Sequence, residues 1–274
     1  TCATCAMSSS RMTRRSTPRP VSSQARMVTA KGGQKFSIGF TVSAKLRLYP
    51  LFAPPMRSVS ALVPHPGGKM EPMTATLTST GSTAAVIVTH QRAELLRASL
   101  EQVVHQTHPV QCVIVVDNGA ENAVRELVES MAGDRGVYVP SETNLGGAGG
   151  FALGFLTALS LGADAVWCAD DDGRPADHTV LAELYRVAEA NRLHEVSPAV
   201  CNINDPDQLA FPLRQGLVWR RRMDELEGDF LPGIASLFNG ALISAAAMEI
   251  IGVPDYRLFI RGDEVEYHLS LIHI

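Results

Sequence analysis

The sequence predicts an α/β fold with a mostly parallel, doubly wound sheet and flanking helices. Short apolar runs of strand length alternate with amphipathic segments of helical length between residues 84 and 201. Polar residues follow directly at the carboxyl ends of three of these runs, at Thr89, Asp117 and Asp170–Asp172. Ligands of parallel sheets bind beyond those ends, so we expect one ligand site there.

The predicted elements follow one another with short connections. The strands are rich in β-branched and small apolar residues, as buried parallel strands are. We expect strands at 84–89, 111–116, 136–140, 163–169 and 196–201. We expect helices, from apolar residues at helical spacing, at 95–106, 123–131, 151–161 and 178–190. After Asp207 the pattern loosens, and one further helix is expected to end near Ile251.

The net charge of −4 divides unevenly along the chain. Residues 1–69 contain 11 lysines and arginines and no acidic residue, whereas residues 70–274 contain 13 basic and 28 acidic residues. The Ser- and Arg-rich first segment fits a basic arm, a transit peptide or, as we prefer, a disordered or non-native upstream extension. We expect the folded domain at 70–268. Residues 269–274 resemble a translated sequencing adaptor, so we expect the native chain to continue past His268.

Cysteine usage predicts a reducing, cytoplasmic environment. Cys112 and Cys168 lie in apolar runs, and the five cysteines form no paired framework. No run of about 18 apolar residues is present, so no spanning helix is expected, while peripheral membrane association stays open. We expect no nucleic-acid partner for the acidic folded part.

Three consecutive aspartates, Asp170–Asp172, follow the run 165–169. Carboxylate oxygens are hard ligands that suit Mg²⁺ or Mn²⁺, and such a cation can bridge the phosphates of a nucleotide sugar. The alternative is a solvated acidic turn before the next helix. Three adjacent like charges at the end of a buried strand favour the cation.

A glycine-rich segment, 144–150, precedes the predicted helix 151–161 and reads NLGGAGG. Glycines allow a close backbone approach to phosphates, and the helix N-terminus after them favours anions. A turn with small residues for helix–sheet packing is an equally good interpretation. The spacing differs from the dinucleotide-binding fingerprint.

Other polar residues also have two interpretations. Asp117 could accept a hydrogen bond from a nucleoside or could form an Asx-turn. Asp263 and Glu264 could supply the base that an acceptor hydroxyl needs, or could form an exposed helix start. The arginines 220–222 could bind a diphosphate or an anionic lipid headgroup, or form a solvated basic face, and Trp219 could stack on a sugar or belong to the core.

Six blocks of the chain resemble the GT-A glycosyltransferases of family 2. Within that family they are most similar to the actinobacterial galactofuranosyltransferases that begin galactan (arabinogalactan, cell-wall) assembly on a polyprenyl-linked rhamnosyl-GlcNAc primer. The blocks, within residues 84–268, are NLGGAGGFALG (144–154), ADDDG (169–173), EVSPAVCNIN (195–204), LAFPLRQGLVWRRR (209–222), LPGIASLFNGAL (231–242) and LFIRGDEVE (258–266).

The resemblance implies a GT-A, nucleotide-diphospho-sugar transferase fold and a UDP-sugar donor site. Thr89 and Asp117 would contact the uridine. Asn144 and the glycines Gly146 and Gly147 would line the donor pocket, and Asp171 would lie at the sugar nucleotide.

The resemblance also implies a metal and a base. Asp170 and Asp172 would flank Mn²⁺ or Mg²⁺ in the manner of a DxD motif. Glu264 is the preferred catalytic base and Asp263 the second choice. The family's later His, a metal ligand in related enzymes, would lie beyond His268.

The function implied is inverting, metal-dependent transfer of galactofuranose from UDP-galactofuranose to a polyprenyl-diphosphate-linked rhamnosyl-GlcNAc acceptor. The enzyme would work in the cytoplasm, at the inner face of the plasma membrane. Two alternatives stay open: a rhamnosyltransferase of the same family, and a nucleotide-sugar-binding fragment without catalysis.

Overall fold

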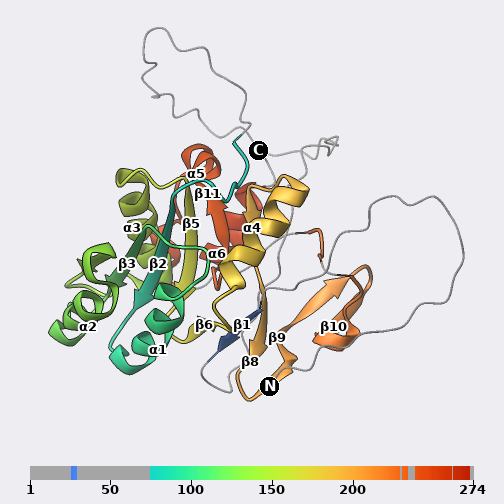
Figure 1. Ribbon diagram of the computed structural model, residues 1–274, viewed down its shortest axis with the longest axis horizontal. Coiled ribbons are helices and arrows are strands. Elements are labelled where there is room, and N and C mark those ends of the chain that lie inside the picture. The colour runs from blue at the N-terminus through green and yellow to red at the C-terminus, as the bar shows by residue number, and fades with distance from the viewer. Residues whose placement is uncertain (1–25, 30–74, 229, 234–237, 261, 272–274) are drawn as a thin grey trace, which may run out of the picture.

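A computed structural model describes residues 26–29, 75–228, 230–233, 238–260 and 262–271 (Figure 1). Of the segment predicted to be disordered or non-native, only one short strand, β1 (Arg26–Thr29), is described. The domain boundaries that we expected at 69 and 268 therefore stay predictions.

A six-stranded sheet forms the centre of the fold, with the strand order β4-β3-β2-β5-β11-β7. Its strands are β2 (Thr83–Thr89), β3 (Cys112–Asp117), β4 (Gly136–Pro140), β5 (Ala165–Asp170), β7 (Glu195–Val196) and β11 (Leu242–Ser244). The pairs β4–β3, β3–β2 and β2–β5 are parallel, whereas β11 runs antiparallel to both of its neighbours. The predicted α/β class with a mostly parallel sheet is confirmed.

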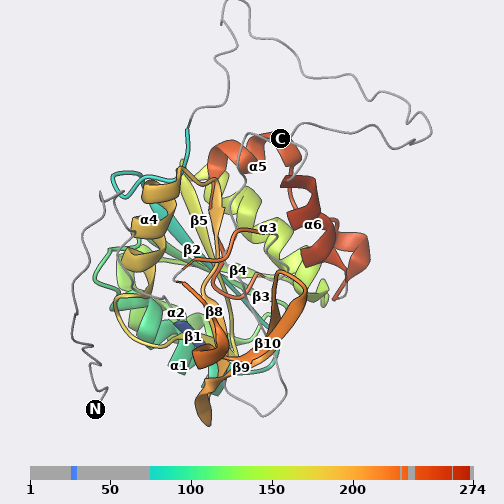
Figure 2. The ribbon, with the colours of Figure 1, turned by 90° about the vertical axis from the view of Figure 1, so that its right-hand side faces the viewer.

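Helices cover both faces of this sheet, which makes it doubly wound (Figures 1 and 2). They are α1 (Ala93–Val104), α2 (Asn122–Ala132), α3 (Gly146–Ser160), α4 (Val180–Asn191), α5 (Ala245–Ile251) and α6 (Asp263–Leu271), with 3-10 turns η1 (Gly133–Arg135), η2 (Met223–Glu225) and η3 (Tyr256–Leu258). Alternate residues of β2 point to opposite faces. Ala85 and Ile87 join the core under α1, α2 and α4, while Val86 joins the core under α3, α5 and α6.

A second sheet lies beside the first and has the order β10-β9-β8-β1-β6. Its remaining strands are β6 (Gly173–Pro175), β8 (Ala199–Asn202), β9 (Asp205–Gln215) and β10 (Val218–Arg222). The loosened pattern after Asp207 is therefore not loop: it includes a hairpin of β9 and β10, which pair in antiparallel register. The single strand expected at 196–201 is wrong, because β7 and β8 are separate strands that pair in different sheets.

Two further predictions of element type or boundary need correction. Helix α3 begins at Gly146, so the glycine-rich segment forms the first turns of the helix and not a loop before it. Residues 242–244 form the antiparallel strand β11, which was not predicted, while the helix expected to end near Ile251 follows directly as α5. Within the described ranges, no helix has the length and apolar character needed to cross a bilayer.

Candidate active site

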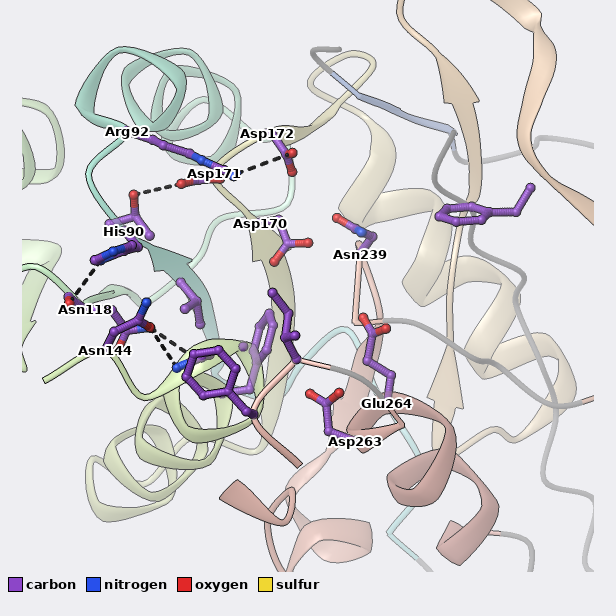
Figure 3. Close-up of a pocket in the computed structure, with 18 residues that line it drawn as sticks. His90, Arg92, Asn118, Asn144, Asp170, Asp171, Asp172, Asn239, Asp263 and Glu264 are labelled. Atoms are coloured by element: carbon purple, nitrogen blue, oxygen red, sulfur yellow. Dashed lines mark hydrogen bonds and ion pairs between the residues drawn. The ribbon is translucent and has the colours of Figure 1, made fainter. Parts of the chain in front are cut away.

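A cavity of about 610 Å³ opens at the carboxyl ends of β2, β3 and β5 (Figure 3). Its volume falls within the range of about 300–1,000 Å³ that small-molecule sites occupy. Strand ends, the start of α3, strand β9 and the start of α6 all contribute to the wall. The lining residues are Val88, Thr89, His90, Arg92, Asn118, Asn144, Gly146, Gly147, Phe151, Asp170, Asp171, Asp172, Phe211, Asn239, Phe259, Ile260, Asp263 and Glu264.

The middle aspartate of the triplet is held by neighbours from the end of β2. The Thr89 hydroxyl donates to Asp171 Oδ2 at 2.9 Å, and Arg92 Nη1 donates to Asp171 Oδ1 at 3.2 Å. Burial nevertheless raises the pKa of the Asp171 carboxyl, and the Thr89 and Arg92 contacts only offset part of that rise. Asp171 is thus held in the wall of the cavity by Thr89 and Arg92.

Asp170 and Asp172 flank this anchored residue and face the cavity (Figure 3). Arg92 lies 3.6 Å from Asp172 Oδ2, so one cation of the protein already reaches the triplet. Among the described residues, no group of three His, Cys, Asp or Glu side chains is arranged to hold a metal ion. Two carboxylates fit a hard cation such as Mg²⁺ or Mn²⁺ when ligand phosphates and water complete its coordination.

Asparagine side chains, not open backbone amides, organise the start of α3. The Asn118 amide accepts from Leu145 N–H at 3.3 Å and donates to the Gly146 carbonyl at 3.0 Å. Asn144 Oδ1 accepts from Gly146 N–H at 2.9 Å, and Ala148 N–H donates to the Phe259 carbonyl at 3.0 Å. These contacts already engage amides that the sequence had suggested for phosphate binding.

The glycines serve close packing, the alternative left open from sequence. A Cβ at Gly150 would lie 2.5 Å from Val88 Cγ1, and one at Gly154 would lie 2.3 Å from Val86 Cγ1. Gly146 has a φ of +69°, and a Cβ there would lie 2.1 Å from the Phe259 carbonyl oxygen. Gly147 differs, because the nearest atoms to its added Cβ are 4.0 Å away and it lines the cavity.

Asp117 is fully buried and is not among the cavity-lining residues. Its carboxylate accepts from Gly119 N–H at 2.9 Å, Glu121 N–H at 2.6 Å and the Tyr138 hydroxyl at 2.9 Å. The Asx-turn alternative therefore describes its contacts in this structure, while a contact with uridine stays a prediction. The next residue, Asn118, lines the cavity at this strand end.

The first residues of α6 bring two more carboxylates to the cavity. Asp263 is only 3% exposed, and burial raises its pKa. Glu264 Oε1 accepts from Phe238 N–H at 3.0 Å. Burial and the charge of Asp170 raise the pKa of Glu264 to about 7, although the Phe238 hydrogen bond opposes the rise. A carboxyl with a pKa near 7 is well matched to accept a proton at neutral pH.

A buried acid–imidazole pair lies behind Glu264. His268, one turn later on α6, contacts Glu195 of β7 through Nδ1 and Oε1, and the two side chains are 0% and 3% exposed. The His268 ring packs against the Phe238 ring at a centroid distance of 5.2 Å. The Phe238 N–H also donates to Glu264, so Phe238 contacts two residues of α6. The contact of His268 with Glu195 joins the same helix to β7 of the central sheet.

The structure therefore gathers all but one of the predicted site residues around one cavity. Those gathered are Thr89, Asn144, Gly146, Gly147, Asp170, Asp171, Asp172, Asp263 and Glu264. Sequence reasoning missed Arg92, Asn118, Asn239 and Phe211. Arg92 and Asn118 follow predicted strands closely, so their proximity to the strand ends was a usable signal. Asn239 and Phe211 lie in two of the six blocks named above, but neither had been assigned a role.

Comparison with known proteins shows the family. The sequence model described as "Glycosyl transferase family 2" matches residues 84–245, more than half of the chain. The chain belongs to glycosyltransferase family 2. The matched segment contains the strands whose ends build the cavity, whereas α6 with Asp263 and Glu264 lies beyond it.

Three curated relatives of this family-2 chain bear the name "Galactofuranosyltransferase GlfT1". The protein from Mycolicibacterium smegmatis is 57% identical over 203 residues, which cover 72% of this chain and 67% of the relative. Two Mycobacterium tuberculosis proteins are 57% identical over 199 residues, covering 70% of this chain and 65% of each relative. The chain thus spans about two thirds of the length of these relatives.

Two solved structures are similar to the chain at low identity. A mannosyltransferase from Pyrobaculum calidifontis, in complex with GDP-Man and Mn²⁺, has a TM-score of 0.47 at 16% identity over 74% of this chain and 55% of that one. S. aureus TarS 1-349 in complex with UDP has a TM-score of 0.45 at 12% identity over 69% of this chain and 55% of that one.

Proposed function

We propose that this family-2 glycosyltransferase moves galactofuranose from UDP-galactofuranose to a polyprenyl-diphosphate-linked rhamnosyl-GlcNAc acceptor, with inversion at the anomeric carbon. The observation that carries the proposal is one cavity that brings the Asp170–Asp172 triplet opposite Asp263 and Glu264 (Figure 3). Identity of 57% to named galactofuranosyltransferases supports the choice of sugar. Their shared family supports a nucleotide-sugar donor and a glycan acceptor.

The geometry suggests how the chain's own residues act. An acceptor hydroxyl oxygen forms a bond to the anomeric carbon while the bond from that carbon to the diphosphate oxygen breaks. Glu264 takes the hydroxyl proton, and its position on α6 is fixed by the Phe238 N–H. Inversion requires the two reacting oxygens to lie on opposite faces of the sugar, which fits a base and an aspartate triplet on different walls of the cavity.

Asp170 and Asp172 are the residues that would hold Mn²⁺ or Mg²⁺. When bound, such a cation neutralises the charge that develops on the leaving diphosphate. Asp171, anchored by Thr89 and Arg92, keeps both neighbours aimed into the cavity. Asn144, Gly146 and Gly147 form the wall where we place the donor, with Thr89 at the nucleoside end.

The acceptor is amphiphilic, so we propose that the enzyme works in the cytoplasm at the inner face of the plasma membrane.

A donor assay tests which sugar is transferred. The chain, and in a separate assay a longer protein that contains it, is incubated with a synthetic rhamnosyl-GlcNAc acceptor. The donor is either UDP-galactofuranose or dTDP-rhamnose. We expect transfer of galactofuranose and no transfer of rhamnose. NMR of the product shows whether the configuration at the anomeric carbon is inverted. Turnover of dTDP-rhamnose but not UDP-galactofuranose would refute the proposal and favour the rhamnosyltransferase.

A further inference from the structure

Three consecutive large apolar residues stand exposed at the tip of the β9–β10 hairpin. Leu217 is 89% exposed, Val218 is 50% exposed and Trp219 is 60% exposed. The turn before them is fixed by Gly216, which has a φ of +63°. Isolated exposed apolar residues are normal on proteins, but a contiguous group at a protruding tip marks an interaction site. The core alternative for Trp219 is therefore wrong, and Trp219 does not line the donor cavity either.

Arginines are the charged residues of the outer part of the hairpin, and the acidic residues that contact them lie outside that part in the sequence. No Asp or Glu occurs between Gln208 and Met223, whereas four arginines do. Arg214 pairs directly with Trp219 across the hairpin, so both side chains lie on one face of the ribbon. Arg220 pairs with Glu227, whose backbone is hydrogen-bonded to Gln215 beside the turn, and Arg222 pairs with Asp205 and Asp224 further along the hairpin. Within the described part of the chain, no carboxylate lies at ion-pair distance from Arg214 or Arg221.

We propose that this tip, Arg214–Arg221, docks the protein on the surface of an anionic lipid bilayer. Tryptophan favours the level of the headgroups, and aliphatic side chains such as Leu217 and Val218 favour the acyl boundary below it. Arg214 and Arg221 can extend toward the headgroup phosphates while their methylene stems stay on apolar surface. A bilayer also suits the small size of the tip, because a specific protein interface needs about 800 Å² from each partner.

The position of the hairpin would bring a docked bilayer close to the cavity. This step rests on the proposed function. Phe211 lies on β9, the same strand that ends at the tip, and it lines the donor cavity. Figure 1 shows β9 and β10 projecting on the side of the molecule away from α2. A bilayer bound at the tip therefore lies beside one wall of the cavity, where a lipid-linked acceptor would arrive.

Tryptophan fluorescence provides a residue-specific test. The chain has two tryptophans, and Trp167 is fully buried, so an emission change on vesicle binding reports Trp219. The full chain is mixed with phosphatidylcholine vesicles containing either no phosphatidylglycerol or 30% of it, with brominated acyl chains as quenchers. We expect a blue shift and quenching with the anionic vesicles only. This readout separates the tip from residues 1–69, whose charge of +11 could also attract vesicles.

Matched variants complete the experiment. L217Q/V218Q should weaken binding to anionic vesicles at least tenfold in co-sedimentation and abolish the blue shift. R214Q/R221Q should weaken binding and make the remaining binding less dependent on salt. L156Q/I250Q removes two exposed apolar side chains elsewhere, 54% and 53% exposed, and should bind as the unmodified chain does. Unchanged binding by L217Q/V218Q, or an equal loss in the control, overturns the proposal.

Two further outcomes are decisive. If the unmodified chain binds no vesicles but self-associates in a manner that L217Q/V218Q abolishes, the tip is a protein interface and the bilayer proposal is overturned. Transfer of galactofuranose to a short-chain, water-soluble acceptor is measured in parallel and should be unchanged in L217Q/V218Q. Absence of that transfer in the unmodified protein would refute the proposed function, while Trp219 quenching would still establish the docking surface.

Discussion

The carboxylates after β5 and those at the start of α6 face one cavity, but different neighbours surround them. Asp171 and Asp172 have the guanidinium of Arg92 at 3.2 and 3.6 Å. Glu264 instead accepts one backbone hydrogen bond and lies half-buried near Asp170, and the loss of solvation and the Asp170 charge raise its pKa to about 7. The two groups of carboxylates therefore differ in charge environment and suit different roles. An aspartate triplet held by the Arg92 guanidinium suits metal and phosphate binding, whereas a half-buried carboxyl with a pKa near 7 suits proton transfer.

The largest effect is expected from neutralising the proposed base. Glu264→Gln should lower kcat by about 10² to 10⁴, because general base catalysis contributes about that much, and donor affinity should change little. Asp263→Asn is the matched control on the same helix turn and should lower kcat less than tenfold. Steady-state transfer assays measure both. If Asp263→Asn were inactive and Glu264→Gln active, Asp263 and not Glu264 would be the base.

Changes at the triplet should act on the donor instead. Asp170→Asn and Asp172→Asn should each weaken Mn²⁺-dependent UDP binding at least about tenfold, because a cation contributes several kcal/mol to charge stabilisation. Isothermal titration calorimetry with and without Mn²⁺ measures the effect. Asp134→Asn, on the exposed 3-10 turn η1, is the control and should bind normally. UDP affinity that does not depend on metal in any of these proteins would contradict the role of the triplet.

The pH dependence should report Glu264. Its pKa of about 7 lies above the ordinary value of 4.5, so the carboxyl is protonated at pH 6 and cannot accept a proton from the acceptor. The rate should therefore fall about tenfold per pH unit below pH 7, as for any single required base. A rate that stays constant between pH 5.5 and 8, with binding and folding intact, would exclude this residue as the base.

Stability should respond in the opposite direction to activity. A carboxyl with a raised pKa binds its proton more tightly in the folded state, so its stabilising contribution is present below about pH 4.5 and is lost as pH rises through 7. Glu264→Gln should therefore raise the free energy of unfolding at pH 8 by about 1–3 kcal/mol and leave it unchanged at pH 4. Thermal or urea unfolding at both pH values measures this.

The counterpart at the triplet is Arg92→Ala. It removes the cation beside Asp171, so it should lower stability at pH 8, and the loss should shrink as acid protonates Asp171. The expected size is under about 1 kcal/mol, because the Arg92 side chain is 52% exposed and solvent screens the pair. If Glu264→Gln and Arg92→Ala shifted stability in the same direction at pH 8, the two clusters would not differ as described.

Much of the donor side was predictable from sequence for a local reason. Parallel strands place their carboxyl ends at one edge, so the polar residues after 84–89 and 165–169 had to lie close together. Thr89 and Asp171 are 82 residues apart and hydrogen-bond at 2.9 Å, as that rule requires. The same rule was insufficient for Asp117, because an Asx-turn draws its carboxylate into the protein and leaves Asn118 at the cavity.

The glycine-rich segment shows how local chemistry leaves two outcomes open. Glycine permits close approach to a phosphate and to a neighbouring side chain equally well. Which of these occurs depends on what lies opposite, and for Gly150 and Gly154 it is the valines of β2. That contact joins residues more than 60 positions apart, so nothing within the segment specifies it.

The alternation of strands and helices, the edge at which a ligand is expected, and the residue types that suit a diphosphate and a cation can all be read from the amino-acid order. Which carboxylate has a pKa suited to a base depends on contacts between distant elements. Strand β11 runs antiparallel between β5 and β7, and the residues before it, Phe238 and Asn239, are thereby set against α6 and the cavity. Burial and neighbouring charges then raise the pKa of Glu264, and both depend on elements that are distant in sequence.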